Sequence, residues 1–192
     1  MDVTDVGRPK YWHMNKKDLR NVIIIGVAVG LLFQPIVANL VASPTFLLRA
    51  AIFFGFVVLA PIALLVAHFL GKFVPVIYQF AKFGAVGSLN SFIDLGVLNL
   101  EIYLTGAASG WPYSVFKAVS FLAAATNSFF WNKYWTFEAG GGRASSEAPK
   151  FYLLTAIGWV LNVSVASFVV NGLPRPEAVS PNLWANIGAV AG

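Results

Sequence analysis

Ionisable and amide side chains occur within, or directly after, two of the most apolar segments of this sequence, about Tyr78 to Leu104 and about Pro112 to Trp131. They are Asn90, Asp94, Glu101, Lys117, Asn127 and Asn132. In hydrocarbon a charged side chain costs several kcal/mol unless it is paired, hydrated or neutralised, so such residues generally mark a functional interior. Their chemistry is that of an ammonium group and amides that can receive an anion, with a carboxylate as the counter-charge.

The spacing predicts an ion pair between Asp94 and Lys117. The loop from Thr105 to Pro112 is short, so the two segments should be antiparallel neighbours. At 1.5 Å per helical residue, Asp94 would lie roughly 15 Å and Lys117 roughly 8 Å below their shared end. A lysine side chain can cover that offset, and amides such as Asn90 would support the pair. Glu101, roughly 3 to 5 Å below the same end, is the competing partner, although it is expected to reach toward water instead.

The other polar residues have a structural interpretation beside a functional one. Asn90 and Asn127 could form ordinary hydrogen bonds between helices. The segment Asn132-Lys133-Tyr134-Trp135-Thr136-Phe137 fits an aromatic belt with a lysine at the membrane surface. In the functional interpretation, Asn132 and Lys133 contact the phosphate of a lipid in the cytoplasmic leaflet. The residues alone leave both interpretations open.

Composition predicts an all-α, polytopic transmembrane helix bundle. Of 192 residues, 58% are hydrophobic and 11% are charged, and the mean hydropathy is +0.72, which is too apolar for a soluble domain. The chain has no cysteine and two isolated histidines, so we expect neither a metal site nor a cofactor. The net charge of +5 falls in loops beside apolar segments, where it meets anionic lipid head groups, so no nucleic-acid partner is expected.

The apolar segments predict about six spans. They are about Val22 to Ala42, Phe46 to Leu70, Tyr78 to Leu104, Pro112 to Trp131, Phe151 to Val170, and a last one from about Leu183. The last has about ten of the ~20 residues that a crossing needs, so we expect it to be truncated or re-entrant. Gly26 and Gly30 form a GxxxG pair, for which packing is favoured over a specific dimer face.

Lysine and arginine are concentrated on one side of the predicted spans. That side holds the N-terminal tail, Lys72, Lys133 and the loop from Gly140 to Lys150, whereas the opposite loops hold Arg49 and Arg175. The positive-inside rule therefore predicts a cytoplasmic N-terminus in the cytoplasmic membrane. The basic tail leads into a full-length span, so we expect it to be retained and not cleaved as a signal peptide.

Two motifs carry a family resemblance. The first is Gln79-Phe80-Ala81-Lys82-Phe83-Gly84-Ala85-Val86-Gly87-Ser88-Leu89-Asn90 followed by Asp94, and the second is Asn127-Ser128-Phe129-Phe130-Trp131-Asn132-Lys133-Tyr134-Trp135-Thr136-Phe137. From about Tyr78 to its end, the chain resembles the GtrA-like family of small polytopic proteins linked to polysaccharide synthesis. The chain then divides into a basic cytoplasmic tail at 1–21, a two-helix hairpin with its linker at 22–75, which looks like an addition to the family unit, and a GtrA-like transmembrane domain at 76–192.

The resemblance also implies a function in the synthesis of cell-envelope glycans. The leading expectation is translocation of a polyprenyl-phosphate-linked sugar, with the phosphosugar head inside the bundle and the prenyl tail in lipid. The substrate-binding residues would be Asn90, Asp94, Lys117, Asn127, Asn132, Lys133 and Trp135. The alternative is a non-transporting adaptor that anchors or regulates a glycosyltransferase.

An enzyme and a monomer are both less consistent with the sequence. It contains no nucleophile with an adjacent base, no metal cluster and no phosphate-cradling loop, so we do not expect catalysis. A bundle of six spans is small for an enclosed path around a large head group. We therefore expect a homodimer, with membrane lipids as its other contacts.

Overall fold

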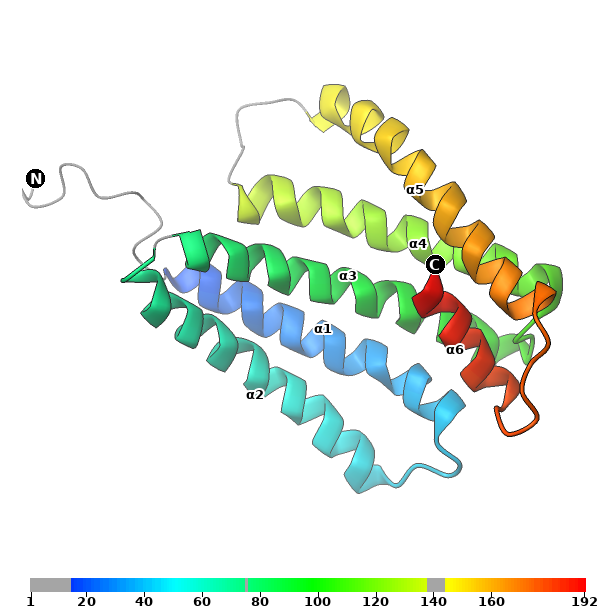
Figure 1. Ribbon diagram of the computed structural model, residues 1–192. Coiled ribbons are helices and arrows are strands. Elements are labelled where there is room, and N and C mark those ends of the chain that lie inside the picture. The colour runs from blue at the N-terminus through cyan, green and yellow to red at the C-terminus, as the bar shows by residue number, and fades with distance from the viewer. Residues whose placement is uncertain (1–14, 75, 138–143) are drawn as a thin grey trace, which may run out of the picture.

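The computed structural model describes residues 15–74, 76–137 and 144–192, with side chains of the last range described from Pro149 onward. Within these ranges the chain is helical and has no strand. The helices are α1 (Lys16–Leu40), α2 (Phe46–Gly71), α3 (Val76–Thr105), α4 (Gly110–Trp131), the π-helical segment η3 (Asn132–Thr136), α5 (Ala144–Gly172) and α6 (Pro181–Ala191). They pack side by side in one bundle (Figure 1), which confirms the predicted all-α architecture.

Several of these helices are long and apolar enough to cross a membrane. Among the described residues they are α1, α2, α3 and the part of α5 from Pro149 to Gly172. The helix α4 does not reach the same hydropathy because Lys117 and Asn127 interrupt it, but its 22 residues would extend about 33 Å. The helix α6 has 11 residues, fewer than the ~20 of a full crossing. The chain is therefore a polytopic membrane protein in which α4 and α6 complete the bundle.

The helix α1 begins at Lys16, earlier than the start of the predicted span at Val22. The side chain of Asn15 caps it by accepting a hydrogen bond from the backbone N–H of Asp18 at 2.8 Å. This early start makes the end of the basic tail helical. As a result, Asp18 and Asn21 are buried in the bundle, a placement that the sequence alone did not indicate.

Glycines on α1 and α3 allow the N-terminal hairpin to pack closely. A Cβ at Gly26 would lie 2.7 Å from the carbonyl oxygen of Phe56, and one at Gly30 would lie 2.8 Å from the ring of Phe53. Both contacts are with α2, so the GxxxG pair serves packing within the chain, as favoured from the sequence. On its other side α1 packs against α3, where a Cβ at Gly96 would lie 2.8 Å from the carbonyl oxygen of Leu32. Figure 1 shows α1 between α2 and α3.

A buried amide network joins α1, α3 and α6 at the end of the bundle that holds the α1–α2 loop. The Asn39 amide donates to the side-chain oxygen of Asn99 at 2.9 Å. Asn99 and Asn186 exchange two side-chain hydrogen bonds, of 2.7 and 3.0 Å. Beside this network, an apolar cluster on α3, α4, α5 and α6 includes Leu98 and Tyr113. The hairpin and the short α6 are therefore held to α3 by polar as well as apolar contacts.

Candidate functional site

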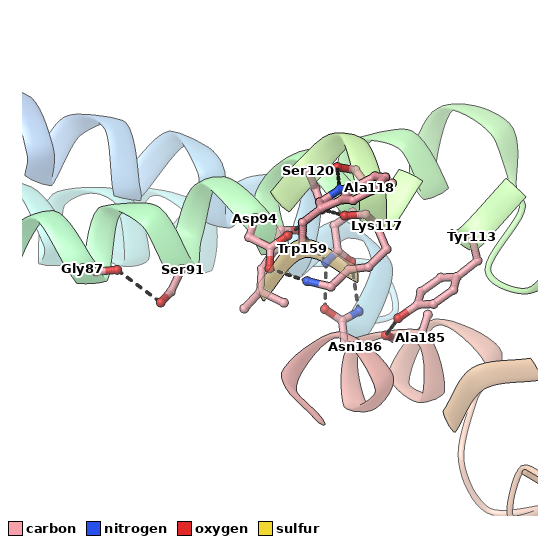
Figure 2. A network of polar contacts seen from close by, with 12 residues as sticks. Gly87, Ser91, Asp94, Tyr113, Lys117, Ala118, Ser120, Trp159, Ala185 and Asn186 are labelled. Carbon is pink, nitrogen blue, oxygen red and sulfur yellow. Dashed lines mark hydrogen bonds and ion pairs between the residues drawn. The ribbon is translucent and has the colours of Figure 1, made fainter. Parts of the chain in front are cut away.

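The predicted ion pair between Asp94 and Lys117 is present where α3 and α4 face one another. The ammonium group of Lys117 binds one carboxylate oxygen of Asp94. The hydroxyl group of Ser120 donates to the other carboxylate oxygen at 2.6 Å. Lys117 and Ser120 are three residues apart on α4, so both side chains reach the same face of α3. Figure 2 shows the two side chains meeting Asp94 between the helices.

The two partners of this pair differ in their exposure. The side chain of Lys117 is 0% exposed, whereas that of Asp94 is 17% exposed. Nearby, the indole N–H of Trp159 on α5 donates to the carbonyl oxygen of Ala118 at 3.0 Å, which holds α5 over this part of α4. A buried charge needs a partner with good geometry to offset its desolvation, and Asp94 is that partner for Lys117, while Ser120 donates to the carboxylate of Asp94. An anion that reached Lys117 would have to replace the carboxylate of Asp94.

The structure corrects two details of the predicted arrangement. Asn90 does not support the ion pair: its side-chain oxygen accepts a hydrogen bond from the amide of Asn127 at 2.7 Å. This bond joins α3 to α4 about one helical turn from Asp94, as the interhelical interpretation predicted. Glu101 neither pairs with Lys117 nor turns fully to water, since one of its carboxylate oxygens is buried without a hydrogen-bond partner in the described chain. These two details were wrong because counting residues at 1.5 Å each gives the depth of a side chain along the helix axis but not the direction in which it points around the helix.

Trp135 is buried, so it does not fit the aromatic-belt interpretation, which was one of the two left open. Its indole N–H donates to one carboxylate oxygen of Asp18 at 2.8 Å. The hydroxyl group of Tyr78 donates to the other at 3.0 Å, and the ammonium group of Lys82 lies 3.1 Å from the first. Lys82 also lies 5.3 Å from the centre of a Trp135 ring. We call these four residues the Asp18 cluster; it ties α1 to α3 and η3.

Sequence reasoning missed Asp18 because it lies in the tail that was expected to be basic and outside the bundle. The available signal was local: an acidic residue three positions after Asn15 suits the first turn of a helix. The contact with Trp135 depends in addition on the π-helical turn, because its wider winding changes the direction in which the side chains of η3 point. Nothing in the spacing of Asn132 to Phe137 indicates that turn.

Lys133 and Asn132 lie in η3, apart from the ion pair. Lys133 is buried, with its ammonium group 6.0 Å from the centre of the Phe129 ring and 5.8 Å from that of Tyr134. The Asn132 amide donates to the hydroxyl group of Ser128 at 3.1 Å. Its side-chain oxygen is buried and has no hydrogen-bond partner among the described residues. The role of these two residues in binding a phosphate stays a prediction.

The predicted binding residues therefore fall into two groups. Asn90, Asp94, Lys117 and Asn127 form a polar seam between α3 and α4, and Asn132, Lys133 and Trp135 belong to η3. Along the helix, Lys117 and Lys133 are about 24 Å apart at 1.5 Å per residue. One small head group cannot contact both at once. In the described ranges, no cluster of three acidic, histidine or cysteine residues could hold a metal ion.

Comparison with known families decides the identity of this bundle. Residues 82–192, which include most of α3 and all of α4 to α6, match the model of the GtrA/DPMS transmembrane domain. The chain belongs to this family. No curated protein and no solved structure matches the chain at a significant level. The GtrA/DPMS match makes this chain a membrane protein of glycan biosynthesis, in a family whose members are generally non-catalytic. The hairpin of α1 and α2 precedes the matched region.

Proposed function

We propose that this GtrA/DPMS protein translocates a polyprenyl-phosphate-linked sugar across the cytoplasmic membrane. The observation that carries the proposal is the buried pair of Asp94 and Lys117, with Ser120 as a second donor, between two helices of the family domain. Charged residues inside a membrane are expensive, and in transporters they mark substrate or ion pathways. A fully buried lysine is also suited to a phosphate, which it can bind as a point charge.

The proposed mechanism is an exchange of anions on one lysine. In the resting state Lys117 is neutralised by Asp94, so the interior carries no net charge at that depth. A phosphosugar head that enters the bundle replaces the carboxylate on Lys117, and Ser120 offers its hydroxyl group to the same head group. The prenyl tail stays in lipid. When the head group leaves on the other side, Asp94 and Lys117 pair again.

The experiment uses the full chain in vesicles that contain a labelled polyprenyl-phosphate sugar. We expect the protein to accelerate the exposure of the sugar to an external reagent. Lys117→Gln should slow this step by about tenfold or more, because it removes a charge-assisted contact with the phosphate of about 1.5–3 kcal/mol. Asp94→Asn should also slow it, because the carboxylate can no longer displace the head group from Lys117. Ser91→Ala is the matched control: its hydroxyl group lies on the same helix and, among the described residues, donates to the carbonyl oxygen of Gly87. No acceleration by the unmodified protein would refute the proposal.

The second candidate is an adaptor that anchors a glycosyltransferase. The observation that favours it is the complete burial of Lys117 in a satisfied pair, which is also what a structural ion pair requires. In that case vesicles would show no translocation, and a glycosyltransferase would co-purify with the full chain. Asp94→Asn would then reduce the stability of the protein and leave the exposure of the labelled sugar unchanged.

A further inference from the structure

A small cavity lies between the first turns of α1 and the end of α4 with η3. Its volume is about 260 Å³, and it is lined by Lys17, Asn21, Phe130, Trp131, Tyr134 and Trp135. Lys17 is exposed and the side chains of Phe130 and Tyr134 are about half exposed, so the cavity is open at its rim. None of these residues contacts the Asp94 pair, and Lys17 and Asn21 precede the part of the chain that matches the family.

Asn21 is the residue that points to a ligand. It is 8% exposed, and within the described ranges its side-chain amide has no hydrogen-bond partner. The buried side-chain atoms of the described residues that lack a hydrogen-bond partner do not include those of Asn21, so its amide is accessible from the cavity and not sealed in the core. Because Asn21 lines the cavity, a ligand with hydroxyl groups could supply the missing hydrogen bonds.

Lys17 provides a positive charge one helical turn from Asn21, on the same face of α1. Its ammonium group donates to the backbone carbonyl oxygen of Tyr134 at 3.4 Å, which is a long bond to a neutral acceptor. An ammonium group has three N–H donors, so Lys17 retains donors for an anion. Lys17 lies in the first turn of α1, where the partial positive charge of the helix N-terminus also favours the binding of an anion.

The remaining wall is aromatic. The rings of Phe130 and Tyr134 are nearly parallel, with centroids 6.3 Å apart and planes 11° apart, and both line the cavity beside the two polar groups. Trp131 and Trp135 complete the wall. Apolar and aromatic walls with a few placed polar groups are the usual composition of small-molecule sites, which commonly measure about 300–1,000 Å³. A cavity of about 260 Å³ is suited to one sugar unit and not to an oligosaccharide.

We propose that this cavity is an entry site for the head group of the lipid-linked sugar, a proposal that rests on the function proposed above. The phosphate binds Lys17, a sugar hydroxyl group bonds to the amide of Asn21, and the sugar ring lies against the aromatic wall. The prenyl chain remains in the lipid outside the rim. The site selects the substrate before the head group reaches Lys117.

The test measures binding to the full chain in detergent by calorimetry, with geranyl-phosphate-linked glucose as the probe. Lys17→Gln should weaken this binding by about tenfold, the value of one charge-assisted hydrogen bond, and should not change the binding of neutral geranyl glucoside. The matched control is Lys16→Gln, which removes the same charge from a neighbouring exposed residue that does not line the cavity. It should change the affinity by less than twofold. An equal loss in both variants would overturn the proposal.

Asn21→Leu separates binding from folding. Because the amide is unpartnered, this change should leave the melting temperature unchanged or raise it. It should also remove the preference for geranyl-phosphate-linked glucose over bare geranyl phosphate. A retained preference would overturn the role of Asn21.

Competing probes identify the source of the phosphate. Phosphatidylglycerol or glucose 1-phosphate that displaced the probe equally well would show a general anion site or a soluble ligand, and either would overturn an entry site for a lipid-linked sugar. If the full chain bound the probe but did not translocate the lipid-linked sugar in vesicles, the proposed transport would be refuted and this binding site would stand. Translocation that is unaffected by Lys17→Gln and Asn21→Leu would support the proposed transport and refute this entry site.

Discussion

Replacing Asp18 by asparagine should weaken the attachment of α1 to α3 and η3 more than any exposed charge change does. Asp18 is 2% exposed, and its carboxylate oxygens lie 2.8 Å from the indole nitrogen of Trp135, 3.0 Å from the Tyr78 hydroxyl group and 3.1 Å from the Lys82 ammonium group. Removing one partner of a buried ion pair commonly costs about 3–5 kcal/mol. Asparagine retains one acceptor oxygen, so we expect a loss near the lower limit, about 3 kcal/mol.

The assay is equilibrium unfolding in mixed detergent, followed by circular dichroism and by tryptophan emission. Glu177→Gln is the control, because it removes an exposed carboxylate in the loop before α6 and should change the free energy of unfolding by less than about 0.5 kcal/mol. The double variant Asp18→Asn with Lys82→Met should lose about 1 kcal/mol less than the sum of the single changes, since the two residues are in contact. A loss below about 0.5 kcal/mol for Asp18→Asn would show that the Asp18 cluster does not hold α1, and the reasoning would fail.

Two further predictions concern packing and orientation. Gly96→Ala should destabilise the protein by about 1–3 kcal/mol, because its Cβ would lie 2.8 Å from the carbonyl oxygen of Leu32, whereas Gly84→Ala on the same helix should be neutral since its Cβ meets nothing within 4 Å. Equal melting temperatures for the two variants would contradict the close contact of α1 with α3. For orientation, single cysteines at the exposed positions Phe73 and Ser109 should react with membrane-impermeant reagents from opposite sides, with Phe73→Cys on the cytoplasmic side. Labelling of both from one side would exclude the expected topology.

Local spacing was sufficient to predict the ion pair of the candidate site. Asp94 and Lys117 are 23 positions apart and are joined by a short loop, which turns at Gly106 and Gly110 with φ of +73° and +74°. Two helices so connected must be antiparallel neighbours, and the rise per residue then gives the depth of each side chain. The same reasoning does not give the direction in which each side chain points around its helix. For this reason it assigned Asn90 to the ion pair, although Asn90 bonds to Asn127.

The sequence by itself determined the class of this protein, because a chain with 58% hydrophobic residues and 11% charged residues must place its helices in lipid. It also determined the family motifs and the pairing of α3 with α4. Only the tertiary structure decided the contacts between distant segments, such as Trp135 with Asp18, which are 117 positions apart. It likewise decided the cavity in which Asn21 lies beside Trp131. The physical reason is that spacing within a segment follows from the helical period, whereas the packing of α1 against η3 depends on how glycines and a π-helical turn orient whole helices.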